Sequence, residues 1–195
     1  MYSSGLRSVG SALGAVTAAV DALVESASPG ALGSCSHEEL TAQVRALRSV
    51  QARLEAVMLS AVREVDARGS HVDEGLLTTG AWLRAHARMS PREATGTVRT
   101  ARVLGSGLLA DTATALAAGK VDPAAVREIV RGVAGAPHGA VLLIESEALA
   151  VASESDPRAV AALMKRFQEA IDPDASDEAA LLRWERRGVT LSQML

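Results

Sequence analysis

The chain has 195 residues, 48% hydrophobic and 22% charged, and this composition excludes a globally disordered protein. Its net charge of −3 gives no support to nucleic-acid binding through bulk electrostatics. With Cys35 as the single cysteine, an internal disulfide and a thiolate metal cluster are also excluded.

The hydrophobic residues favour an all-helical fold. Only four aromatic residues occur, so Ala, Leu and Val must build most of the core. Ala has the highest helix propensity, and its small side chain lets helices approach closely, which favours helix-on-helix packing over stacked sheets. We therefore predict an all-α multi-helix bundle of about nine helices joined by short connections.

Residues 1–35 predict an N-terminal amphipathic helix followed by a linker that begins at Ser28-Pro29-Gly30. The uncharged stretch from Val9 to Val20 is too short to span a membrane, so we expect no membrane association and a cytoplasmic location. The apolar residues recur at alternating steps of three and four, which places them in one stripe: Leu6, Val9, Leu13, Val16, Val20 and Leu23.

Residues 36–195 predict the main helical domain, which opens with a long helix over residues 36–68. Ser36 and Glu39 have the spacing of a capping box, and Gly69 ends the apolar period. About 32 residues make a helix roughly 48 Å long. A helix of this length either spans a bundle or pairs with a homodimer mate or a partner protein, and both alternatives remain open.

A loop over residues 69–77 precedes a bundle of shorter helices over residues 78–187. Capping residues and prolines predict where six of these helices start: Thr79, Ser90, Asp122, Pro137, Asp156 and Ser176. A further helix is expected from Leu108 to Ala118, after the break at Gly105-Ser106-Gly107. The apolar run after Pro137 is compatible with a strand, but Glu145 and the flanking alanines favour a helix. Only residues 189–191 have an extended pattern.

The segment from Thr79 to Leu104 has the layout of a helix-turn-helix pair, whose second helix can enter the major groove of DNA. Ala94, Val98, Ala101 and Leu104 fall on one side of that second helix, and basic residues fall on the other. Five arginines against Glu93 make the segment from Arg84 to Leu104 locally basic. The candidate contacts to double-stranded DNA are Arg84, Arg88, Arg92, Thr95, Arg99 and Arg102.

Solvated surface, or a protein contact, explains the same pattern. Most helical bundles contain two helices joined by a tight turn, and an Arg-rich outer face is usually exposed to water. The turn also lacks the glycine that is common in DNA-binding pairs, because Arg88 and Met89 occupy that region. The residues therefore leave two functions open: a DNA-binding or targeting module, and a dimerisation or interaction scaffold without nucleic-acid contact.

We predict no catalytic residue, no metal site and no cofactor. The four histidines are far apart and lack a second ligand at helical spacing, and no Gly-rich loop precedes a Lys-Ser or Lys-Thr pair. Cys35 and His37 lie two residues apart in a loop, where adjacent residues rarely reach the geometry of a nucleophile and its base.

The segment from Gly75 to about Val133 resembles a bacterial family known as domain of unknown function 222, or the 13E12 repeat family. The resemblance rests on Trp82-Leu83, on residues of the Arg-rich helix, on Gly119-Lys120-Val121 and on the ending Arg186–Leu191. The chain departs from the family's common pattern at Gly105-Ser106-Gly107, where a proline is usual, and at Ala124-Ala125, near which a histidine is usual.

The resemblance implies the helical domain that often precedes an HNH nuclease domain. An HNH domain holds a metal with His and Asn, and the sequence contains no Asn. We therefore expect this chain to represent the helical part alone, without a nuclease motif, and to be no enzyme itself. The family supplies no established active residues for that helical part.

Overall fold

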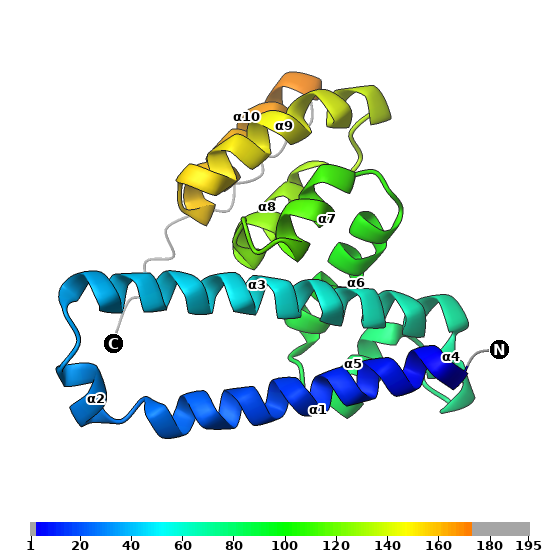
Figure 1. The fold of residues 1–195 in the computed structure, drawn as a ribbon. Helices are drawn as coiled ribbons and strands as arrows, with labels where there is room; N and C mark the ends of the chain where they lie inside the picture. The colour runs from blue at the N-terminus through cyan, green and yellow to red at the C-terminus, as the bar shows by residue number, and fades with distance from the viewer. Residues whose placement is uncertain (1–2, 173–195) are drawn as a thin grey trace, which may run out of the picture. The chain divides into compact units, whose positions relative to one another are not determined.

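The computed structural model describes residues 3–172, and all regular structure in that range is helical (Figure 1). The all-α prediction is confirmed. The helices of the described range are α1 (Ser3–Ser26), α2 (Pro29–Gly33), α3 (His37–Arg68), α4 (Ser70–Asp73), α5 (Thr79–Ala87), α6 (Pro91–Gly105), α7 (Ala110–Ala117), α8 (Pro123–Gly132), α9 (His138–Glu154) and α10 (Pro157–Ile171). The predicted helix after Ser176 and the extended residues 189–191 lie outside this range.

The chain divides into two compact units, and the boundary between Leu47 and Arg48 falls inside α3. The first unit contains α1, α2 and the start of α3. The second contains the rest of α3 and α4 to α10.

The N-terminal stripe lies on a single helix, α1, as the spacing predicts. The break at Ser28 also starts the one-turn helix α2, because the Ser28 hydroxyl accepts a hydrogen bond from the amide of Ala31 at 3.3 Å. Within α1, the 18 residues Val9–Ser26 have a mean hydropathy of 1.3. By length and composition alone this segment is long and apolar enough to cross a membrane, since the helix continues past Asp21.

The long helix α3 begins where the capping box predicts. The Ser36 amide donates to the Glu39 carboxylate at 2.7 Å, and the Glu39 amide donates to the Ser36 hydroxyl at 3.2 Å. Those hydrogen bonds hold the pKa of Glu39 below its usual value. The 32 residues of α3 end at Arg68, and the next residue, Gly69, takes a left-handed conformation with φ of 67°. One turn of helix, α4, then occupies part of the predicted loop.

Small aliphatic side chains form the core of the second unit. No aromatic side chain of the described range is among its fully buried residues, which confirms the prediction from composition. Helix α8 lies at the centre, with Ala125, Val126, Ile129 and Val130 all at most 1% exposed. Gly132 ends that helix against Met164 of α10, at a point where a β-carbon would overlap the methionine side chain.

A buried carboxylate ties α9 to α7. One carboxylate oxygen of Glu145 accepts hydrogen bonds from the amide and the hydroxyl of Thr112, both at 2.8 Å. Thr112 lies in the first turn of α7, where backbone amides have no partner within the helix. Glu145 therefore satisfies an amide at the start of one helix from a position in the middle of another, and the predicted helix after Pro137 is confirmed.

Candidate nucleic-acid interface

The site starts from two helices joined by a short turn. The Thr78 hydroxyl caps α5 by accepting from the Ala81 amide at 3.1 Å, and Ser90 and Glu93 form a capping box at the start of α6. Between them Arg88 adopts the left-handed conformation with φ of 55°, alone among the non-glycine residues of the described range. An arginine thus takes the conformation for which glycine is usual in such turns.

Helix α6 has the two faces that its sequence predicts. Ala94, Val98 and Ala101 are buried, and Leu104 is partly buried. The opposite side is an exposed row of side chains: Arg92, Thr95, Arg99 and Arg102. Thr97 and Thr100 are also buried, so the exposed row is narrow.

Arg102, one member of this row, is neutralised by a neighbouring carboxylate. Its Nε and Nη2 atoms donate to the two oxygens of Asp66 in α3, each at 2.7 Å. The buried hydroxyl of Thr79 donates to the same carboxylate at 2.5 Å. The hydrogen bonds from Arg102, with a smaller contribution from Thr79, lower the pKa of Asp66 to about 2. Arg102 therefore links α6 to α3.

Thr95 is likewise occupied within its own helix. Its hydroxyl donates to the carbonyl of Pro91 at 2.9 Å, so the hydroxyl hydrogen is not available to an outside acceptor in this conformation.

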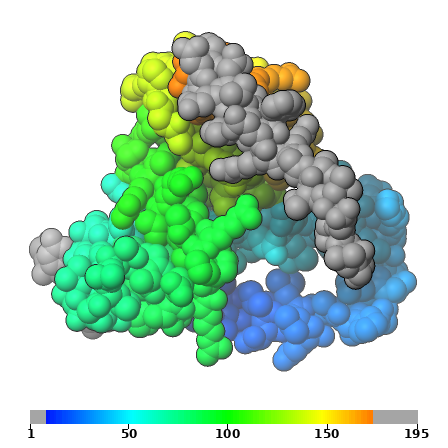
Figure 2. Space-filling view, turned by 180° about the vertical axis from the view of Figure 1, so that it is seen from behind, coloured from blue at the N-terminus to red at the C-terminus, as the bar shows by residue number. Residues whose placement is uncertain are grey.

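The remaining four candidates are free to meet an anion. Arg84, Arg88, Arg92 and Arg99 are all exposed, and none forms an ion pair within the described part of the chain. We call these four residues the open arginines. Figure 2 shows elongated side chains of the green part of the chain, which includes α6, standing away from the surface.

A groove brings further arginines beside α6. It has a volume of about 780 Å³, and its walls come from α3, α6 and α8. Arg92 and Arg99 of α6 line it together with Arg127 and Arg131 of α8. The sequence pattern around α6 carried no signal for the α8 arginines, because they approach α6 only through tertiary packing.

Carboxylates neutralise part of the positive charge of this groove. Arg127 pairs with Glu55 at 3.2 Å, and Arg131 pairs with Glu128 at 2.7 Å. Burial raises the pKa of Glu55. The positive charge of Arg127 lowers this pKa, and the negative charge of Glu93 raises it further. The residues that line the groove include four arginines and two glutamates, Glu55 and Glu93, so the lining has a positive net charge. The arginines without an ion-pair partner in the described part of the chain are Arg92 and Arg99.

His86, which lies between arginines in the sequence, is engaged with its own helix and the segment before it. Its Nε2 atom lies 2.6 Å from the Glu74 carboxylate, which also accepts from the indole of Trp82 at 2.9 Å. These hydrogen bonds lower the pKa of Glu74, and the bond from Trp82 contributes more than the one from His86. In the described residues no group of three or more His, Cys, Asp or Glu side chains has a metal-binding arrangement.

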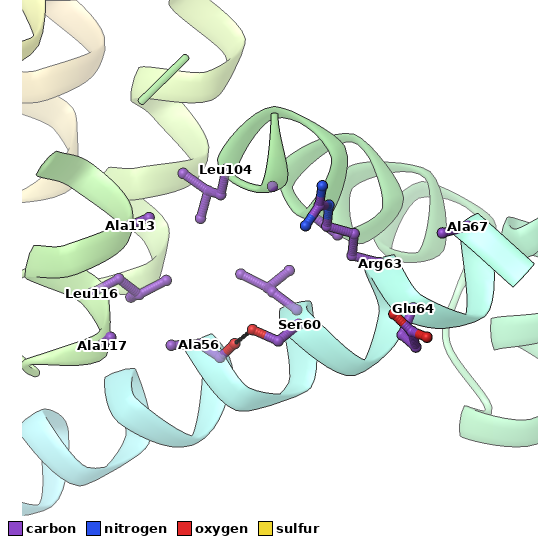
Figure 3. A pocket seen from close by; sticks show the side chains of 12 residues that line it. Ala56, Ser60, Arg63, Glu64, Ala67, Leu104, Ala113, Leu116 and Ala117 are labelled. Carbon is purple, nitrogen blue, oxygen red and sulfur yellow. Dashed lines mark hydrogen bonds between the residues drawn. The ribbon is translucent and has the colours of Figure 1, made fainter. Parts of the chain in front are cut away.

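A second hollow, of about 320 Å³, lies among α3, α6 and α7 (Figure 3). Leu104 and Leu116 face it from one side, and Ala56 and Ser60 from the other. The Ser60 hydroxyl donates to the Ala56 carbonyl at 2.9 Å, and the outer part of the Arg63 side chain lies against Gly105. Ser60, Arg63 and Glu64 are the polar residues of this lining, and its other residues are alanines, leucines and Gly105.

Comparison with known proteins identifies one family. The model of a family described as a domain of unknown function (DUF222) matches residues 41–194, which is most of the chain and excludes α1. Neither the curated proteins nor the solved structures contain a match to this chain.

Proposed function

For this chain, which belongs to the DUF222 family, we propose a role in binding double-stranded DNA through its phosphate backbone. The open arginines carry the proposal: four exposed guanidinium groups that have no carboxylate partner among residues 3–172, on a chain whose net charge is −3. Guanidinium groups bind phosphate in a bidentate manner, and each contact releases counterions from DNA.

The surroundings of α6 favour phosphate contact over reading of base edges. A recognition helix must project from the protein, because the major groove is only about 12 Å wide. Helix α6 is buried over most of its circumference, and its exposed row borders a groove whose other walls are α3 and α8. Arginines in this setting can reach along a phosphate backbone, whereas the helix itself cannot enter a DNA groove deeply.

In this proposal the helical domain holds DNA for a nuclease domain of the HNH kind, which the family resemblance implies. Backbone contacts fix position and orientation without reading sequence. We therefore expect weak dependence on base sequence and a dissociation constant of about 10⁻⁶–10⁻⁴ M at physiological salt.

A charge-reversal pair tests the proposal. Arg92→Glu combined with Arg99→Glu removes two open arginines and places two carboxylates at the groove. The control is Arg158→Glu combined with Arg166→Glu, which makes the same charge change at two exposed arginines of α10. Fluorescence anisotropy with a labelled duplex at low salt should show at least tenfold weaker binding for the α6 pair and a much smaller change for the α10 pair.

Circular dichroism provides the folding control, because both pairs replace exposed side chains and should retain the helical signal. Equal loss of affinity in both pairs would show that only the overall charge matters. Unchanged binding in the α6 pair would remove the open arginines as the site.

A further inference from the structure

Helix α1 presents an apolar stripe that no other helix of its unit covers. Val9, Leu13, Val16, Val20 and Leu23 are between 37% and 53% exposed, although each is a large aliphatic side chain. In the described residues 9–26, α1 is also long and apolar, with a mean hydropathy of 1.3. A helix with such a stripe gains stability when a partner covers it.

The spacing of the stripe identifies the kind of partner. The five residues are separated by steps of four, three, four and three, an average of 3.5 residues. This is the repeat of a coiled-coil seam, because it keeps one straight line of side chains facing a second helix that winds around the first. We call these five residues the α1 seam.

The residues beside the seam permit pairing with an identical helix. Gly10 and Thr17 flank it on one side, and Ala12 and Ala19 flank it on the other. Two copies of one chain bring identical flanks together, so charges of one sign at these positions would repel. The flanks are neutral, and their small size lets two backbones approach closely.

We propose that α1 pairs with α1 of a second copy of this chain. Asp21 and Glu25 lie away from the seam, at positions that stay in water when two helices pair. The same two carboxylates oppose burial of the helix in a lipid bilayer. Residues 9–26 also lack the Lys or Arg residues with which an interfacial helix holds an anionic membrane surface.

The size of the seam sets the expected strength of the dimer. From residue 9 to residue 26 the helix is about 27 Å long and about 10 Å wide. Two such footprints fall well short of the roughly 1,200–2,000 Å² that specific stable interfaces bury. The pairing is therefore a reversible dimer that forms at micromolar concentrations or above.

Sedimentation equilibrium of the full chain tests the pairing. The apparent mass should rise with concentration from 20.1 kDa toward twice that value. Leu13→Asp with Val20→Asp places charge in the seam and should hold the chain at the monomer mass. Ser11→Asp with Ala18→Asp places the same charges on the opposite side of α1 and should leave the dimer intact.

Because a charged seam also weakens α1 itself, cysteine cross-linking provides a second test that preserves the helix. Val16 is the midpoint of the seam, so in a parallel pair it meets its own counterpart, and in an antiparallel pair centred on the seam the two copies lie in adjacent layers. In a Cys35→Ser background, Val16→Cys should form an interchain disulfide in a glutathione buffer, and Ala18→Cys should not.

A monomer at every concentration, or equal cross-linking at positions 16 and 18, overturns the proposal. So does a monomer that sediments with phosphatidylcholine vesicles and loses that property in the seam variant, because a membrane would then be the partner. The DNA-binding proposal is tested separately, since the Arg92→Glu and Arg99→Glu pair should leave the dimer mass unchanged.

Discussion

At the scale of single residues, the carboxylate of Asp66 organises the surroundings of the candidate interface. It accepts two hydrogen bonds from Arg102 and one from Thr79, so one side chain of α3 holds both α5 and α6. Thr79 is 1% exposed, and its hydroxyl finds this acceptor at 2.5 Å and the Nδ1 atom of His71 at 3.3 Å. The arrangement keeps Asp66 ionised to low pH, with a pKa of about 2.

Asp66 should make stability depend on pH in the acid range. Its pKa is lower in the folded chain than the ordinary value of 3.8, so its contribution is present above pH 4 and is lost as pH falls toward 2. Since the Arg102 side chain is 62% exposed, solvent screening limits that contribution to about 1 kcal/mol. Asp66→Asn should lower the free energy of unfolding by about this amount at pH 7 and flatten the decline between pH 4 and pH 2 in denaturant titrations.

A matched change on the same helix separates this network from ordinary surface charge. Glu64 pairs with Arg68 at 2.6 Å, but both side chains are more than half exposed. Glu64→Gln should therefore change stability by only a few tenths of a kcal/mol. Equal effects of the two substitutions would contradict the role assigned to Asp66.

The same residues show what the sequence can and cannot predict about the site. The row on α6 follows from helical spacing, and the structure places all four of its members on the exposed side. The state of each guanidinium group does not follow from spacing. Arg102 finds its carboxylate 36 residues away, a pairing that depends on how α3 packs beside α6.

At the scale of elements, local chemistry made the helix starts predictable. Ser36 with Glu39, Ser90 with Glu93, and the aspartates before Pro123 and Pro157 all cap helices within three residues. Where the predictions differ from the structure, the deciding residues lack such a cap. The helix expected from Leu108 begins at Ala110, because Leu109 is fully buried in a non-helical conformation.

Two glycines in helices should respond oppositely to the same substitution. Nothing lies within 4 Å of a β-carbon at Gly96 in α6, so Gly96→Ala should stabilise the protein by about 0.5–1 kcal/mol through helix propensity. A β-carbon at Gly132 would overlap the side chain of Met164. The overlap includes the β-carbon of Met164, which cannot move unless the backbone of α10 moves. Gly132→Ala should therefore destabilise the protein by about 1–3 kcal/mol.

Thermal unfolding provides the measurement for this pair. For a chain of this size each kcal/mol moves the melting temperature by about 2–4 °C. Gly96→Ala should raise the midpoint and Gly132→Ala should lower it. A rise in both would mean that α8 and α10 separate easily enough to accept the added methyl group.

At the scale of the whole molecule, an acidic chain carries its basic residues unevenly. The net charge is −3, yet the segment from Arg84 to Leu104 contains five arginines and a single acidic residue. Packing extends this asymmetry, because Arg127 and Arg131 of α8 face the same groove as Arg92 and Arg99. The groove could not be predicted, since its walls come from residues between positions 55 and 131 and depend on the packing of three helices.

The salt dependence of DNA affinity counts the guanidinium groups that take part. Each neutralised phosphate contributes about −0.9 to the slope of log affinity against log salt, so the four open arginines predict a slope of about −3.6. Arg92→Gln or Arg99→Gln alone should make the slope less negative by about 0.9. Arg102→Gln with Asp66→Asn should leave it unchanged, because that pair is already neutral in the folded chain. Anisotropy titrations at several salt concentrations measure the slopes of the unchanged chain and of these three variants. If the Arg102→Gln and Asp66→Asn pair makes the slope less negative by as much as Arg92→Gln does, then Arg102 leaves Asp66 to bind phosphate.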